Sequence, residues 1–222
     1  PSIVVHALLD SPSTTGAYKF TIQPGEATVM DIEATLFTRK TIPHVGIAPL
    51  TSMFLHGYAD QRRSKDFRPS VHDSEGVAIW NGSGELLWRP LTNPKTLQIS
   101  AFMDKDPKGF GLWQRGRNFQ DFQDLEARYE RRPSVWVEPK GAWGEGFIEL
   151  VEIPVEDEIH DNIAVYWKPA KGAEAGKSLK FDYRLHWAEN IPAAWSGARV
   201  AKTRIGNAKK PETFLFVIDF QR

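Results

Sequence analysis

The chain has 222 residues, enough for one large domain or two small ones with a buried core. Its 28 lysines and arginines equal its 28 aspartates and glutamates, so no net charge favours nucleic acid or an anionic membrane as a partner. The absence of cysteine excludes disulfides, thiolate metal sites and a cysteine nucleophile. Eight tryptophans and thirteen phenylalanines suit β-strands, and exposed indoles can also stack on sugar rings.

Strand patterns dominate the chain. Tyr18–Ile22 alternates before a Pro24-Gly25 turn, and residues 27–36 continue the alternation. Val77–Trp80 and Glu85–Trp88 flank Asn81-Gly82-Ser83-Gly84 and predict a hairpin. Further strands are expected at 97–103, 134–137, 147–151, 163–167 and 179–187, and only 119–131 has helical character. The series predicts an all-β fold, a large antiparallel β-sandwich.

Both ends of the chain have the pattern of a strand interior. We therefore expect a piece of a longer protein, in which residues 1–198 form the latter part of a sandwich domain. Arg199–Pro211 is basic and poor in large apolar side chains, which predicts a linker. Residues 212–222 would then be the first strand of a second, truncated domain. No window has the length and apolar character of a membrane span, and none is expected.

The sequence does not favour a metal site or a cofactor. The six histidines have no i, i+2 or i, i+4 pair, so a zinc site is not expected. A P-loop, a dinucleotide fingerprint and a Gly-x-Ser-x-Gly elbow are also missing, which disfavours phosphate and acyl chemistry.

Two aspartates that follow histidines, Asp73 and Asp161, are candidates for a pair of catalytic carboxyl groups. Glycoside hydrolysis needs one carboxyl group as an acid and another as a base or nucleophile. Either aspartate could instead cap a turn, as loop aspartates commonly do. Glu158 could crowd Asp161 and raise its pKa, or it could belong to a solvated acidic loop.

Other polar residues could support such a pair. Arg62, Arg63 and Arg68 could bracket Asp73 and keep it ionised, or they could be surface charges. The segment 114–132 is dense in mixed charge and contains Arg128 and Tyr129, so it predicts either a polar network lining a cleft or an exposed ion-paired helix. His72 is expected to support its neighbour Asp73.

Most of the eight tryptophans must belong to the core. Trp80 and Trp88 flank the predicted hairpin, and Trp143 lies in a glycine-rich loop expected at a cleft rim. These three indoles are the candidates for sugar-binding platforms.

Several long strings resemble the periplasmic glucan biosynthesis family of the MdoG/OpgG and OpgD type. They are Leu9-Asp10-Ser11-Pro12-Ser13, Gly46-Ile47-Ala48-Pro49-Leu50-Thr51-Ser52-Met53-Phe54, Phe67-Arg68-Pro69 through His72-Asp73-Ser74, Trp88-Arg89-Pro90-Leu91, Gly109-Phe110-Gly111-Leu112, Asp124-Leu125-Glu126-Ala127-Arg128-Tyr129-Glu130-Arg131-Arg132-Pro133-Ser134, Trp136-Val137-Glu138-Pro139 and Asp161-Asn162-Ile163. They occur in family order over most of the chain.

The resemblance implies a periplasmic protein of Gram-negative bacteria that acts on osmoregulated glucans with a β-1,2-linked backbone. It also implies a galactose-mutarotase-like sandwich followed by an immunoglobulin-like domain. Some members resemble inverting endo-β-1,2-glucanases, which makes Asp161 the general acid and Asp73 the base. Tyr129 and Glu158 fall on matching motif positions, whereas His160 departs from the asparagine expected there.

The leading hypothesis is therefore a glucan-processing enzyme that hydrolyses or transfers at β-1,2 bonds. A second hypothesis is a non-catalytic glucan-binding protein that assists the membrane glucosyltransferase or branching. A third, a sugar mutarotase or epimerase, rests on analogy of fold alone.

Overall fold

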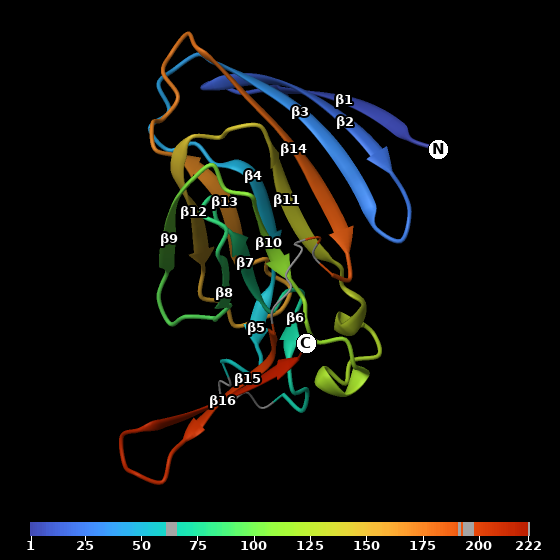
Figure 1. The fold of residues 1–222 in the computed structure, drawn as a ribbon, viewed down its shortest axis with the longest axis vertical. Helices are drawn as coiled ribbons and strands as arrows, with labels where there is room; N and C mark the ends of the chain where they lie inside the picture. Colours follow the sequence, from blue (N-terminus) through green and yellow to red (C-terminus); the bar gives the residue numbers. More distant parts are fainter. Residues whose placement is uncertain (61–65, 191, 193–197, 222) are drawn as a thin grey trace.

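The computed structural model describes residues 1–60, 66–190, 192 and 198–221. Its strands pair in antiparallel fashion and form two stacked sheets with two small hairpins (Figure 1). The larger sheet has eight strands, in spatial order β1 (Ile3–Asp10), β2 (Thr14–Gln23), β3 (Thr28–Thr38), β14 (Ser178–Ala188), β11 (Ser134–Lys140), β10 (Gly109–Trp113), β7 (Gly76–Trp80) and β8 (Leu86–Pro90). The smaller sheet has four, in the order β4 (Ile47–Ser52), β13 (Ile163–Pro169), β12 (Glu145–Glu152) and β9 (Gln98–Lys105). The all-β sandwich predicted from the sequence is confirmed, and its galactose-mutarotase-like type remains a prediction.

The core lies between the inward faces of the two sheets. Alternate residues of β7 and β10 enter it, including Val77, Ile79, Phe110 and Leu112. The smaller sheet contributes alternate residues of β12 and β13. This period of two is what a strand buried on one face requires.

Two short hairpins complete the fold. β5 (Phe54–His56) pairs with β6 (Val71–His72), and β15 (Arg199–Asn207) pairs with β16 (Phe214–Gln221). Figure 1 shows β15 and β16 at the opposite end of the molecule from β1 and β2.

The segment 199–207, which lies within the predicted linker, forms a strand. Its basic composition suggested a linker, but Thr203 and Ile205 pair with Ile218 and Phe216 of β16. An apolar partner strand thus supplies the backbone hydrogen bonds that the basic segment needs. The proposed division into domains, with an immunoglobulin-like domain beginning here, remains a prediction.

The segment 119–131 contains two short 3-10 turns, η1 (Phe119–Asp121) and η2 (Tyr129–Arg131), in place of a helix. The carboxylate of Asp124 accepts hydrogen bonds from the backbone N–H groups of Glu126 and Ala127, which gives the chain an alternative to helical bonding. In the described part of the chain, no helix is long and apolar enough to cross a membrane.

Candidate functional site

Asp73 and Asp161 are both attached to one short segment of chain, residues 51–54. The backbone N–H of Asp73 donates to the carbonyl of Met53 at 2.9 Å. The hydroxyl of Thr51 donates to Oδ2 of Asp161 at 3.4 Å. This segment joins β4, which pairs with β13, to β5, which pairs with β6. Two aspartates far apart in the sequence therefore lie on neighbouring elements.

The buried side-chain amide of Asn162 fixes the backbone next to Asp161. Its Oδ1 accepts a hydrogen bond from the N–H of Phe54 at 2.8 Å, and its Nδ2 donates to the carbonyls of Phe54 and Ile153 at 3.0 Å each. An amide with three backbone partners is a rigid anchor. Sequence reasoning assigned Asn162 no role, although it lies in the same string as Asp161.

Asp73 is half-buried and faces charge of both signs. The guanidinium Nε of Arg132 lies 3.0 Å from its Oδ1, as an ion pair without hydrogen-bond geometry. Burial raises the pKa of Asp73 above its usual value, Arg132 lowers it, and the negative charges of Asp161 and Glu158 raise it. Asp161 and Glu158 therefore lie close enough to Asp73 for their charges to act on it.

Glu158 is held by two donors. The phenol of Tyr129 donates to its Oε2 at 2.8 Å, and Nη1 of Arg68 donates to the same oxygen at 2.9 Å. Burial and the neighbouring carboxylate raise the pKa of Tyr129, so the phenol stays protonated and acts as a donor.

Arg68 forms its ion pairs with a different set of carboxylates from the one expected. It pairs with Asp66 and Asp124 at 2.6 Å each and with Glu158 at 2.9 Å, and the described residues include no pair between it and Asp73. The expectation that Arg68 brackets Asp73 is therefore wrong. Arg132 takes that position, and the mixed-charge character of 114–132 was the only signal for it. Arg62 and Arg63 lie outside the described residues.

His72 is fully buried and packs in an aromatic cluster. Its ring stacks on Phe54 at 5.2 Å between centroids and meets Phe122 edge-on at 5.1 Å. Burial lowers its pKa to about 4, so the ring is neutral near pH 7. Its backbone pairs with Phe54 between β5 and β6, and a supporting role toward Asp73 remains a prediction.

Arg128 adopts a left-handed backbone conformation with φ of 52° and pairs with Glu130 at 2.8 Å. Its side chain remains partly exposed, so a role in substrate binding stays a prediction.

Trp80 and Trp88 belong to a second aromatic cluster with Trp113 and Trp136. They alternate with the core residues of β7 and β8, so they lie on the face of the larger sheet away from the sandwich core. Lys108 lies 5.3 Å from the ring of Trp80, and Arg115 lies 4.0 Å from the ring of Trp88. Sugar binding by these two indoles remains a prediction.

Trp143 is a core residue. Its side chain is 7% exposed and packs against Trp167, Phe181 and Tyr183. The predicted position at a cleft rim is therefore wrong, because the glycines on either side let the loop fold its indole inward. Trp195 lies outside the described residues.

No cluster of three or more histidine, aspartate or glutamate residues that could hold a metal ion occurs among the residues the structure describes. Around Asp73 and Asp161 the structure places the carboxyl group of Glu158, the phenol of Tyr129 and the guanidinium groups of Arg68 and Arg132.

Comparison with known proteins decides the family. A family model described as periplasmic glucan biosynthesis protein, MdoG, matches residues 1–222. The chain belongs to this family. Relatives named glucans biosynthesis protein G include one from Vibrio cholerae serotype O1, 56% identical over 222 residues, and one from Shewanella frigidimarina, 57% identical over 223 residues. These alignments cover 99% of this chain but only 41% and 40% of the two relatives, so the chain spans about two-fifths of their length.

Proposed function

We propose that the protein takes part in the biosynthesis of glucans in the periplasm and processes their β-1,2-linked backbone. The reaction proposed is that of an inverting endo-β-1,2-glucanase or a related glycosyl-transferring enzyme. The family description supports the glucan and the compartment, and the resemblance of the motif strings supports the linkage.

The observation that favours an enzyme is the attachment of Asp73 and Asp161 to the shared segment 51–54. Asp161 is exposed and Asp73 is half-buried, so both carboxyl groups can meet a substrate from solvent. The negative charge of Asp161 also acts on the pKa of Asp73, as expected for two groups that share one site.

In this mechanism Asp161 protonates the departing glycosidic oxygen. Asp73 takes a proton from the attacking water, either directly or through a relay. A raised pKa of Asp73 would suit a general base and a general acid equally well. The assignment of Asp161 as the acid and Asp73 as the base therefore rests on the resemblance. Tyr129 and Arg68 keep Glu158 fixed beside the pair, where its charge adds to the raised pKa of Asp73.

The test uses the full-length protein and linear β-1,2-glucan. Wild type should shorten the glucan, whereas Asp161→Asn should lose about two to four orders of magnitude in rate. A β-1,2-linked disaccharide with a nitrophenol leaving group needs little acid assistance, so it should restore much of the rate of Asp161→Asn and little of that of Asp73→Asn.

Asp10→Asn is the matched control, because its carboxylate lies on the edge strand β1 and is exposed. Equal shortening by wild type and Asp161→Asn would contradict the acid assignment. Glucan binding without any shortening would favour the non-catalytic hypothesis, in which the protein assists the membrane glucosyltransferase.

A further inference from the structure

Two loops beside the candidate site enclose an open groove of about 540 Å³. Residues 66–68, which lead into β6, line one side of it, and residues from the segment 119–126, between β10 and β11, line the other. Phe67 and Leu125 are each 78% exposed, and Phe119 is 36% exposed. A patch of large exposed apolar side chains marks an interaction surface or a ligand-binding groove, whereas single ones need no explanation.

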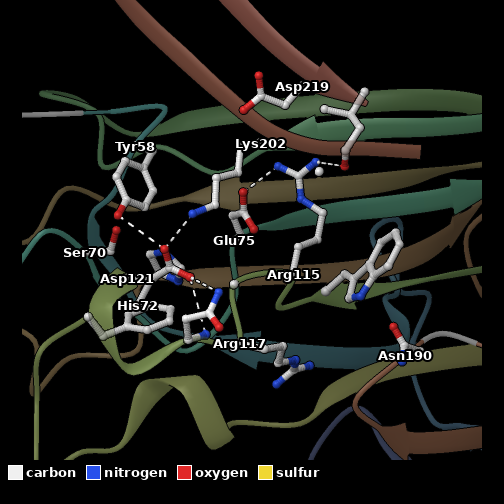
Figure 2. Close-up of a pocket in the computed structure, with 16 residues that line it drawn as sticks. Tyr58, Ser70, His72, Glu75, Arg115, Arg117, Asp121, Asn190, Lys202 and Asp219 are labelled. Carbon is white, nitrogen blue, oxygen red and sulfur yellow. Dashed lines mark hydrogen bonds and ion pairs between the residues drawn. The ribbon is translucent and has the colours of Figure 1, made fainter. Parts of the chain in front are cut away.

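The segment 119–126 is held in place at two points. Asp121 faces a separate cavity beside the β15–β16 hairpin, where it bonds Lys202 at 2.6 Å, as Figure 2 shows. Asp124 lines the groove and pairs with Arg68 at 2.6 Å. The apolar side chains of the groove are therefore presented by a fixed backbone, so a ligand would not have to order the segment on binding.

Arg68 connects the groove with the candidate site. The same Nη1 atom that pairs with Asp124 donates a hydrogen bond to Glu158 at 2.9 Å. Glu158 in turn lies close enough to Asp73 for its charge to act on that carboxyl group. The groove is thus next to the aspartates, and a polymer bound at the aspartates can extend into it.

The charges of the groove disfavour an anionic ligand. Asp66 and Asp124 each pair with Arg68 at 2.6 Å, so one guanidinium group faces two carboxylates. The exposed carboxylate of Glu126 adds a third negative charge to the lining. This surplus repels anions and leaves a neutral or a cationic ligand as the partner.

The side chains of the groove match a carbohydrate. The phenyl ring of Phe67 offers a flat apolar face, on which the C–H groups of a sugar ring can lie. The carboxylate of Glu126 and the amide of Gln123 can accept hydrogen bonds from hydroxyl groups. A cationic peptide could also meet the negative charge, but the position beside the two aspartates favours the chain on which they act.

We propose that this groove binds the glucan chain several sugar units away from the bond at Asp73 and Asp161, with Phe67 as the platform for one glucose ring. The inference rests on the proposed function for the identity of the chain. It adds a preference for long glucans over short ones, because only a long chain reaches both the aspartates and the groove.

The test measures binding of linear β-1,2-glucan by calorimetry, with full-length Asp161→Asn protein so that the chain stays intact. Adding Phe67→Ala should weaken binding about tenfold, as expected for the loss of an aromatic contact surface. Phe67→Tyr keeps the ring and should bind like its parent, whereas Phe67→Leu keeps only the apolar character and should bind more weakly. Phe37→Ala is the matched control, because this phenylalanine is 49% exposed on β3, and it should leave the affinity unchanged.

A second measurement separates the groove from the aspartates. The β-1,2-linked disaccharide with a nitrophenol leaving group is too short to reach the groove. Phe67→Ala in the otherwise wild-type protein should therefore leave kcat/KM for this disaccharide unchanged and raise KM for the long glucan about tenfold.

Equal glucan affinity in Phe67→Ala and its parent would overturn the proposal, even if wild type shortens glucan. Full affinity in Phe67→Leu would also overturn it, because no ring would then be needed. Loss of self-association in Phe67→Ala at unchanged glucan affinity would assign the surface to contact between copies. Tighter binding of a lysine-rich peptide than of glucan would assign it to a basic partner. Glucan that binds with this dependence on Phe67 but is not shortened would support the groove and contradict only the proposed function.

Discussion

The guanidinium Nε of Arg132 lies 3.0 Å from Oδ1 of Asp73. This cation opposes the burial that raises the pKa of Asp73. The two effects act on the carboxyl group that the proposed mechanism uses as a base, so the position of Arg132 should determine the pH at which the site becomes active.

Replacing Arg132 with glutamine should move the acidic limb of the kcat/KM pH profile to higher pH. Without the guanidinium, the pKa of Asp73 rises further, and a higher pH is needed to ionise it. The movement should be limited, because Arg132 is 47% exposed and solvent screens part of its charge. Arg131→Gln is the control, since its side chain is 72% exposed and lies 3.9 Å from Glu130. An unmoved limb in Arg132→Gln would exclude Asp73 as the titrating base.

Tyr129→Phe should lower the free energy of unfolding by about 1.5–3 kcal/mol, because it removes a hydrogen bond to a charged group. The phenol donates to Glu158 at 2.8 Å and is buried. Tyr58→Phe removes a phenol whose bond to Asp121 is 3.4 Å long, so its effect should be smaller. Urea unfolding of the full-length protein measures both, and equal losses would show that the Tyr129–Glu158 bond adds no special stability.

His72 should make the protein less stable as the pH falls from about 6.5 to about 4. The pKa of the folded state is lowered from 6.5 to about 4 by burial, so in this window the unfolded chain binds a proton that the folded chain does not. Stability is therefore fully present above pH 6.5 and decreases as the pH falls through the window.

His72→Phe keeps an aromatic ring between Phe54 and Phe122 but cannot titrate. Between pH 6.5 and 4, the slope of its free energy of unfolding against pH should be smaller than that of wild type. The difference corresponds to at most one proton taken up on unfolding. His56, whose pKa is also lowered by burial, titrates in both proteins and cancels in the comparison. Identical slopes in His72→Phe and wild type would contradict the claim that the buried imidazole of His72 is neutral in the folded protein.

Trp143→Ala should cost about 3–5 kcal/mol of stability, as expected for removal of a large aromatic side chain from a core. The control is Trp187→Ala on β14, because that indole is 37% exposed and leaves a smaller cavity. Thermal unfolding compares the two. A loss at Trp143 no greater than that at Trp187 would contradict its place in the core.

The strands could be predicted from the sequence because their signals are local. The hairpin expected at 77–88 corresponds to β7 and β8, whose apolar alternation and turn residues are all within one short stretch. The strand at 199–207 could not be predicted in this way, because it depends on pairing with the apolar residues of β16. Trp143 illustrates the same limit, since burial of a loop residue depends on distant strands.

The candidate site could be predicted only in part. Its two aspartates were candidates from the sequence pattern, and the resemblance supplied their roles. Their connection, however, depends on two registers, Ser52 with Ile163 and Phe54 with His72. No local pattern encodes these pairings, so Thr51 and Asn162 were assigned no role. Arg132 was missed for a related reason, because nothing in its neighbourhood distinguishes it from the other arginines of 114–132.

The most direct test of the central claim is the configuration of the sugar end first released from linear β-1,2-glucan. Proton NMR during the first minutes of reaction with the full-length protein distinguishes the two anomers before they interconvert. The proposed roles of Asp161 and Asp73 predict the α-anomer, because water attacks from the face opposite the departing oxygen. Release of the β-anomer, or of no new reducing end, would contradict the account.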